Sequence, residues 1–253
     1  MKIAVCIKQV PTREWQPRLN DDKTWIREQD VSYEMNEPDA YALEESLRLR
    51  EKHSGEVVVC SAGPTRVQQV IREALARGAD RAIHVDDAAL GGADAFAAAA
   101  ALAPAMADEH FDLILTGLQS DDQGHAQFGP VLATRLGVPH STIIMEVVVD
   151  GSTLRVKCEL EGGWFQHVAM PLPALLTIQS GINQLRYATL KGIMAAKKKD
   201  IKRVVPTEAV QSRQKVLALY HPTKSKQTVM IGGSPAEAAK ELVKRLREEA
   251  RVL

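Results

Sequence analysis

The polar segment from Gly117 to Gly129 has the residue types in this chain that best suit a charged ligand. It follows an apolar, strand-like run, contains glycine at positions 117, 124 and 129, and leads into a helical pattern. Backbone N–H groups in such a loop, helped by the positive end of the helix dipole, are suited to holding a phosphate. On glycine spacing alone, an ordinary strand-to-helix loop would be the simpler interpretation.

The rest of the sequence offers little for metal or covalent chemistry. Asp121 and Asp122 are of a type that binds metals, but adjacent acids in a loop are more often solvated or cap a helix. The seven histidines show no ligand spacing to cysteine or carboxylate. The nucleophile, dinucleotide-binding and P-loop motifs do not occur in the sequence. We therefore predict no metal site and no catalytic residue, which favours a carrier or binding module over an enzyme.

A second candidate site combines apolar and basic residues. Leu190, Ile193 and Met194 lie beside the lysine run Lys197–Lys199. An apolar cluster rimmed by charge usually marks a surface for a partner, and we expect this one to be exposed. For the three lysines alone, a solvated basic linker would explain the pattern equally well.

Strand patterns alternate with helical patterns in the first half of the chain, which predicts an α/β fold with parallel βαβ units. The expected strands are residues 2–8, 56–60, 81–85 and 112–117. If the first strand is central, with the second and third on one side and the fourth on the other, the strand order reverses between strands one and four. Ligands bind at such a reversal, so the Lys8-Gln9-Val10 loop and the 117–129 loop should meet there.

The helices and the second half of the chain show further signals. Asn36 is expected to cap a helix that starts at Glu37, and the pattern after residue 140 indicates an antiparallel extension of the sheet. Its expected strands are residues 142–149, 153–159, 165–170 and 174–179. We predict a nucleotide-binding α/β domain at 1–180, a recognition loop and extended arm at 181–233, and a C-terminal helix at 234–253 that begins with the capping box of Ser234 and Glu237.

Composition excludes several classes of protein. Lys+Arg and Asp+Glu are both 32, so the chain lacks the basic footprint of a nucleic-acid binder. Cys6, Cys60 and Cys158 have no metal-ligand spacing and are expected to be buried, inert thiols. The sequence shows no membrane-spanning run and no signal or transit peptide, so we expect a cytoplasmic protein without membrane insertion.

Several segments together resemble the electron-transfer flavoprotein beta subunit family. The resemblance runs from Met1 to about Ile201. It rests on Ile3-Ala4-Val5-Cys6-Ile7-Lys8-Gln9-Val10-Pro11, Met35–Glu45, Gly63-Pro64, Arg72–Asp80, the 117–129 loop, and Arg186-Tyr187-Ala188-Thr189-Leu190 through Lys199. It implies an adenine-nucleotide α-hydrolase-like fold, a heterodimer with an alpha subunit that holds most of the electron-carrying FAD, and a structural AMP in this chain.

The resemblance also implies roles for individual residues. The positions that match AMP-binding ones are Cys6, Asn36, Glu37, Pro38, Asp39, Ala62, Leu118, Gln119, Ser120, Asp121, Asp122, Gln123, Gly124, His125, Ala126, Gln127, Phe128 and Gly129. Leu190 matches a leucine that enters a pocket on acyl-CoA dehydrogenases, within a recognition loop that carries Ile193, Met194, Lys197, Lys198 and Lys199. Glu159 matches an acid that restrains the mobile flavin domain. The implied function is to carry electrons from such dehydrogenases to a quinone oxidoreductase.

Two alternatives accompany this interpretation. Relatives that bifurcate electrons from NADH bind a second FAD in place of AMP and carry an acid and a threonine where this chain has Gly124 and His125. That departure counts against bifurcation but leaves it open, because both ligands share an adenylate. The other alternative is a nucleotide-binding module of the universal-stress type, which would need neither the arm nor the recognition loop.

Overall fold

The computed structural model describes residues 1–14, 17–206, 210–222 and 228–253. Its core is a nine-stranded, largely parallel sheet with the strand order β11-β5-β4-β1-β6-β10-β7-β8-β9. The strands are β1 (Lys2–Cys6), β4 (Glu56–Gly63), β5 (Arg81–Asp86), β6 (Leu113–Gly117), β7 (His140–Asp150), β8 (Thr153–Glu159), β9 (Phe165–Pro171), β10 (Ala174–Ile178) and β11 (Ile201–Val204). A separate small antiparallel pair joins β2 (Gln9–Pro11) to β3 (Tyr33–Met35).

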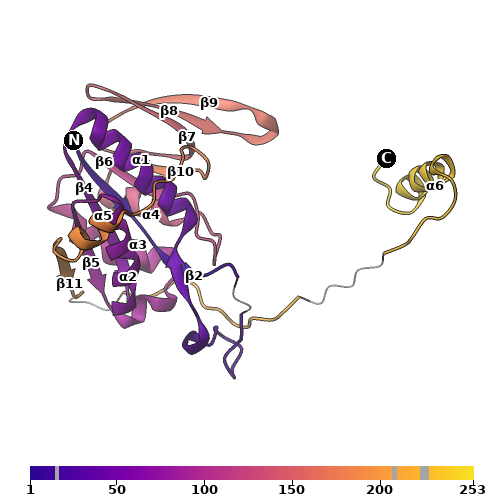
Figure 1. The fold of residues 1–253 in the computed structure, drawn as a ribbon, viewed down its shortest axis with the longest axis horizontal. Helices are drawn as coiled ribbons and strands as arrows, with labels where there is room; N and C mark the ends of the chain where they lie inside the picture. The colour runs from indigo at the N-terminus through magenta and orange to yellow at the C-terminus, as the bar shows by residue number, and fades with distance from the viewer. Residues whose placement is uncertain (15–16, 207–209, 223–227) are drawn as a thin grey trace.

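Helices cover both faces of the sheet (Figure 1). The helices of the described residues are α1 (Glu37–His53), α2 (Gln68–Arg77), α3 (Ala95–Ala107), α4 (Phe128–Leu136), α5 (Leu190–Ala196) and α6 (Pro235–Glu248), with short 3-10 helices η1 (Glu28–Asp30), η2 (Thr65–Val67), η3 (Ala88–Gly92) and η4 (Glu161–Gly163). Of these, α6 does not lie on the sheet (Figure 1). Alternate residues of β1 enter different cores, because successive side chains of a strand point to opposite faces. Ile3 packs with α1 and α2, whereas Ala4 packs with α3 and α4.

The predicted strand reversal is confirmed. β4 and β5 extend to one side of β1, and β6 pairs with β1 on the other side, all in parallel. The carboxyl ends of β1 and β6 therefore form the switch point of the sheet. Glycine just past a helical run is a common C-cap, so the sequence predicts helix ends at Gly78 and near Gly137. Both residues have positive φ at the C-caps of α2 and α4.

The second half of the sheet differs from the expected antiparallel extension. β7, β8 and β9 are antiparallel neighbours, but β10 inserts parallel between β6 and β7. All five residues of β10 are buried, whereas β9 is mostly exposed. A strand that is buried on both faces belongs inside a sheet, which explains why β10 returns to its middle.

Residues 181–233 also contain more regular structure than the expected arm. The segment forms α5, which packs on α2, and then β11, which adds a parallel edge strand beside β5. Residues 207–209 and 223–227 of the expected arm lie outside the described residues. The sheet thus recruits residues beyond the expected boundary at residue 180.

The C-terminal helix begins as predicted. The Ser234 hydroxyl accepts the N–H of Glu237, and the Glu237 carboxylate accepts the N–H of Ser234, which completes a capping box. None of the residues of α6 is buried, and Figure 1 shows the helix (yellow) apart from the sheet. Leu242 and Val243 on its apolar stripe are about half exposed, at 48% and 45%.

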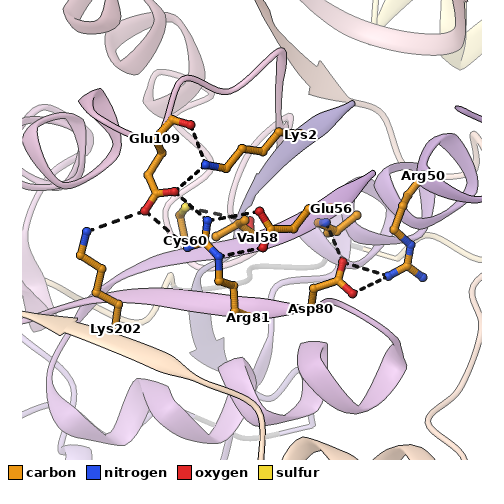
Figure 2. A network of polar contacts seen from close by, with 10 residues as sticks. Lys2, Arg50, Glu56, Val58, Cys60, Asp80, Arg81, Glu109 and Lys202 are labelled. Carbon is orange, nitrogen blue, oxygen red and sulfur yellow. Dashed lines mark hydrogen bonds and ion pairs between the residues drawn. The ribbon is translucent and has the colours of Figure 1, made fainter. Parts of the chain in front are cut away.

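An ion-pair network joins the amino ends of the strands (Figure 2). Arg81 on β5 contacts both Glu56 on β4 and Glu109 in the loop before β6, while Lys2 on β1 donates to Glu109 at 2.7 Å. Hydrogen bonds from Arg81 and Lys2 lower the pKa of Glu109 to about 2. The network lies at the amino-terminal ends of the strands, on the opposite side of the sheet from their carboxyl ends. We therefore expect it to contribute stability rather than ligand binding.

None of the described helices combines the length and the apolar composition that a membrane crossing requires.

Candidate functional site

A cleft opens at the switch point, between the carboxyl ends of β1 and β6 and the start of α3. The expected residues that line it are Cys6, Asn36, Asp39, Ala62, Leu118, Gln119, Ser120, Gln123, His125, Ala126, Gln127 and Phe128. Glu37, Pro38, Asp121, Asp122, Gly124 and Gly129 are not among the lining residues. The structure therefore gathers most of the expected nucleotide positions around one cavity.

The opposite wall of the cleft was missed by sequence reasoning. Apart from Asp94, it consists of small and apolar residues of η3 and α3, namely Leu90, Gly91, Ala93, Ala95, Ala98 and Leu102. Ile7, Lys8 and Gly117 complete the lining. In the sequence, this wall is visible only as a run of alanines. Such a run indicates a helix but does not show that the helix lines a cleft.

Asn36 occupies the N-cap position of α1 but does not cap the helix with its side chain. Its amide donates to the backbone carbonyl of Gln119 at 3.0 Å and accepts the N–H of Asp121 at 2.9 Å. The cap is supplied from the loop instead, because the Asp121 carboxylate accepts the N–H of Glu37. The predicted N-cap position of Asn36 is confirmed, but its side chain does not supply the cap bond. The helix and the 118–121 loop hold each other in place through these bonds.

Asp39 ties α1 to the ends of two strands. Its carboxylate is buried and accepts the N–H groups of Lys8 at 2.8 Å and Gly117 at 2.9 Å. Burial raises the pKa of Asp39 to about 7, because these donors and Asn36 offset only part of the loss of hydration. The carboxyl lies at the floor of the cleft, where its charge state acts directly on the site.

The raised pKa of Asp39 predicts a pH dependence of stability. The folded state binds the proton of the Asp39 carboxyl more tightly than the unfolded chain does. The stability that comes from this tighter binding is therefore fully present at low pH, and it is lost as pH rises from about 4 to about 7. We expect the free energy of unfolding of the protein, measured against Asp39→Asn by urea titration, to fall by on the order of 2 kcal/mol between pH 5 and pH 8. Parallel pH profiles of the two proteins would contradict this.

Lys8 is the only lysine or arginine among the residues that line the cleft, all of which lie in the described part of the chain. Its ammonium donates to Asp122 at 2.7 Å, to Ser120 at 3.2 Å and to Gln123 at 3.3 Å. The two acids weighed as metal ligands thus have other roles, since Asp121 caps α1 and Asp122 pairs with Lys8. The described residues contain no cluster of three side chains arranged to bind a metal.

The start of α4 presents backbone donors to the cleft. Gln127 precedes the helix without a side-chain cap, and in the described structure the N–H groups of His125, Gln127 and Phe128 have no protein acceptor. The N–H of Gly124 is committed to the carbonyl of Ser120 at 2.8 Å, so Gly124 shapes the loop rather than offering a donor. Free N–H groups at a helix N-terminus form a ready site for an anion.

The thiol of Cys6 lies at the cleft, beside Cys60 on the neighbouring strand. A hydrogen bond with Cys60 and burial raise the pKa of the Cys6 thiol, which keeps it protonated and unreactive. Cys60 and Cys158 are also buried, as expected from the sequence.

The apolar cluster before the lysine run forms an exposed surface on α5. The exposed fraction is 83% for Leu190 and 62% for Met194, and Ile193 is also exposed. Lys197 and Lys198 are exposed too.

Lys199 differs from the other residues of this segment, because its ammonium donates to the carbonyls of Leu75 and Ala79 at the end of α2. The structure thus brings five of these residues to one surface and directs Lys199 inward.

Arginines fix this surface to the body of the protein. Arg186 pairs with Glu44 at 2.8 Å and with Glu51 at 2.6 Å on α1, and Arg72 on α2 donates to the carbonyls of Ala196 and Lys199. Burial alone would raise the pKa of Glu44, but the Arg186 and Arg48 guanidiniums outweigh it and hold the pKa below its usual range. Leu190 therefore projects from a braced helix rather than from a loose loop.

Glu159 ends β8, where its carboxylate accepts the amide of Gln179 at 3.2 Å. It is partly exposed, and the neighbouring turn presents Trp164 with an exposed fraction of 75%. Glu159 is not among the residues that line the cleft at the switch point.

The largely parallel sheet, the helices on both of its faces and the cleft at its switch point together define an α/β protein. Comparison with known proteins narrows the class. The Electron transfer flavoprotein domain family matches residues 23–209. The chain is 36% identical to the electron transfer flavoprotein subunit beta of Methylophilus methylotrophus, with 98% of each chain covered. It is 37% identical to that of Thermoanaerobacterium thermosaccharolyticum (97% of this chain, 98% of the relative) and 33% identical to that of Homo sapiens (100% and 99%). The chain belongs to the electron transfer flavoprotein beta subunit family.

Proposed function

We propose that this chain works with an alpha subunit to carry electrons from dehydrogenases of the acyl-CoA class to a quinone oxidoreductase, and that its cleft holds a structural AMP. The observation that carries the proposal is that one chain combines a cleft with an apolar wall and unpaired N–H groups with the exposed helix α5, which we call the docking helix. The proposed location is the cytoplasm. A universal-stress module is not supported, because the family resemblance extends over nearly the whole chain.

The two walls of the cleft suit the two halves of AMP. Ala95, Ala98 and Leu102 offer an apolar surface for a purine ring. On the other side, Lys8 and the unpaired N–H groups at the start of α4 offer positive charge and hydrogen bonds for a phosphate. The Asp39 carboxylate at the floor of the cleft is engaged by the N–H groups of Lys8 and Gly117, so we assign it a structural role. Redox chemistry would come from the flavin held mainly by the alpha subunit.

The docking helix suits a partner with an apolar pocket and an acidic rim. Lys191, Lys197 and Lys198 are exposed on or directly after α5, which also exposes Leu190 and Met194. Such a pattern gives affinity through the apolar anchor and speeds association through the charges. Glu159 is proposed to restrain the flavin domain of the alpha subunit.

Nucleotide analysis of the purified heterodimer tests the proposal. Denaturation should release one FAD and one AMP per heterodimer, and the beta chain expressed alone should be colourless. Release of two FAD and no AMP would favour the bifurcating alternative, in which a second FAD occupies the same cleft and NADH is oxidised. Release of no second nucleotide at all would overturn the assignment of the cleft.

Lys8→Met should weaken AMP binding at least tenfold, because a charge-assisted hydrogen bond contributes about 1.5–3 kcal/mol. Isothermal titration of AMP into the nucleotide-free heterodimer measures this. Lys191→Met is the matched control, since Lys191 lies on α5 and away from the cleft.

A second variant tests whether Lys8 binds the phosphate of AMP or only holds the loop in place. Asp122→Asn removes the carboxylate that competes for the Lys8 ammonium. If Lys8 binds the phosphate, this variant should bind AMP as well as or better than the parent protein. An equal loss in Lys8→Met and Asp122→Asn would instead mean that Lys8 only holds the loop.

A further inference from the structure

One buried carboxylate connects the nucleotide cleft to the C-terminal arm. Asp94 caps α3 by accepting the N–H of Ala97 at 2.8 Å. Its other oxygen accepts the N–H groups of Arg213 at 2.6 Å and Gln214 at 2.8 Å. Its own N–H donates to the hydroxyl of Ser212 at 3.2 Å. Asp94 therefore holds residues 212–214 of the arm against the first turn of α3.

Further contacts keep the arm on this surface. The Arg213 guanidinium lies 5.0 Å from the ring centre of Phe96, whose ring also meets Arg135 of α4 at 4.5 Å. The N–H of Leu219 donates to the carbonyl of Lys23 at 2.7 Å. Burial would raise the pKa of Asp94, but the N–H donors outweigh it and hold the pKa below its usual range. Asp94 thus stays charged and fully engaged at neutral pH.

The same turn of α3 forms a wall of the cleft. Asp94 lines it together with Ala93, Ala95 and Ala98. A ligand in the cleft and the arm residues 212–214 therefore contact the same short piece of backbone. When a ligand orders the first turn of α3, residues 212–214 can bind to it at a smaller loss of conformational entropy, and the reverse also holds. The two binding events are then positively coupled without a change of fold.

We infer that Asp94 couples nucleotide binding to the arm, so that a nucleotide in the cleft stabilises the anchored residues 212–214 and thereby strengthens capture of the alpha subunit. The inference rests on the proposed function for the ligand and the partner. The arm leads from this anchor to α6, whose apolar stripe is uncovered in this chain. Because coupling is reciprocal, the alpha subunit should also tighten nucleotide binding by the same factor.

Asp94→Ser isolates the coupling. Serine is as good an N-cap as aspartate, so its hydroxyl keeps the bond to Ala97, but it lacks the second oxygen that holds Arg213 and Gln214. Asp87→Ser is the matched control, because Asp87 caps η3 through Ala89, whereas the bonds to residues 212–214 come from Asp94. Ser212→Ala removes one anchoring bond from outside the cleft and serves if Asp94→Ser fails to fold.

Two quantities are measured for each variant, once without AMP and once with AMP at saturation. Direct titration determines the saturating AMP concentration for each variant. The first is hydrogen exchange of the Arg213 and Gln214 amides in the full chain. The second is the affinity of the chain for the alpha subunit. In the parent protein and in Asp87→Ser, AMP should slow the exchange and tighten the affinity at least fivefold, at the low end of typical couplings. In Asp94→Ser both effects should fall below about twofold, and Ser212→Ala should reduce them partly.

The outcomes separate the inference from the function on which it rests. If AMP binds the parent protein but changes neither amide exchange nor subunit affinity, the coupling is overturned and the nucleotide site stands. Full AMP effects in both Asp94→Ser and Ser212→Ala would also overturn the coupling. If neither AMP nor FAD binds the parent protein in the titration, the proposed nucleotide function fails, and the coupling fails with it.

Discussion

Leu190→Ala should lower the affinity of the heterodimer for the proposed dehydrogenase partner by roughly thirtyfold, because truncating an anchor in a partner's pocket typically costs about 2 kcal/mol or more. The side chain is 83% exposed, so it contributes little to the core of this chain. The rate of flavin reduction by a dehydrogenase at limiting heterodimer concentration measures the effect. Flavin content and melting temperature should stay unchanged.

Val205→Ala provides the matched control for Leu190→Ala. Val205 is also an exposed apolar residue, at 62%, but it follows β11 rather than lying on α5. The Val205→Ala variant should therefore leave the rate of flavin reduction unchanged. A lower melting temperature with unchanged kinetics in Leu190→Ala would instead show that the leucine packs within the heterodimer. Raising the ionic strength should slow association further, because the lysine rim is exposed to solvent.

The parts of the fold that local sequence determines were predicted well. The alternation of strands and helices, the glycine C-caps at Gly78 and Gly137 and the Ser234 capping box all follow from short-range chemistry, and the structure confirms them. The switch point also followed, because parallel βαβ units allow few strand orders. The 117–129 loop could be placed at the cleft on that ground alone.

Features that depend on distant contacts were missed. The position of β10 in the middle of the sheet is set by pairing with β6 and β7, which its own sequence does not encode. Asn36 has the right residue type for a cap, but the loop from Gln119 to Asp121 offers its side chain other partners. The alanine-rich start of α3 gave no ligand signal, since small apolar residues mark a site only once the fold faces them toward a cleft.

Gly117 shows how closely the elements of the site approach each other. This glycine ends β6, and a Cβ at its position would lie 2.4 Å from the Asp39 carboxylate and 2.7 Å from the Asp39 backbone nitrogen. The second contact is with the backbone of α1, so rotating the Asp39 side chain does not relieve it. Only glycine fits here without moving α1, which carries both Asn36 and Asp39 at the site.

Gly117→Ala should therefore destabilise the chain by on the order of 3 kcal/mol, at the upper end for overpacking a well-packed interior. It should also abolish AMP retention by the purified heterodimer, because shifting α1 moves Asn36 and with it the 118–121 loop that Asn36 holds. Urea unfolding and nucleotide release on denaturation measure the two effects. Gly232→Ala, where an added Cβ meets nothing within 4 Å, should change neither. Adding Asp39→Ala to Gly117→Ala should restore little, since the backbone contact remains; full recovery would mean that the carboxylate alone, and not the position of α1, requires a glycine at this strand end.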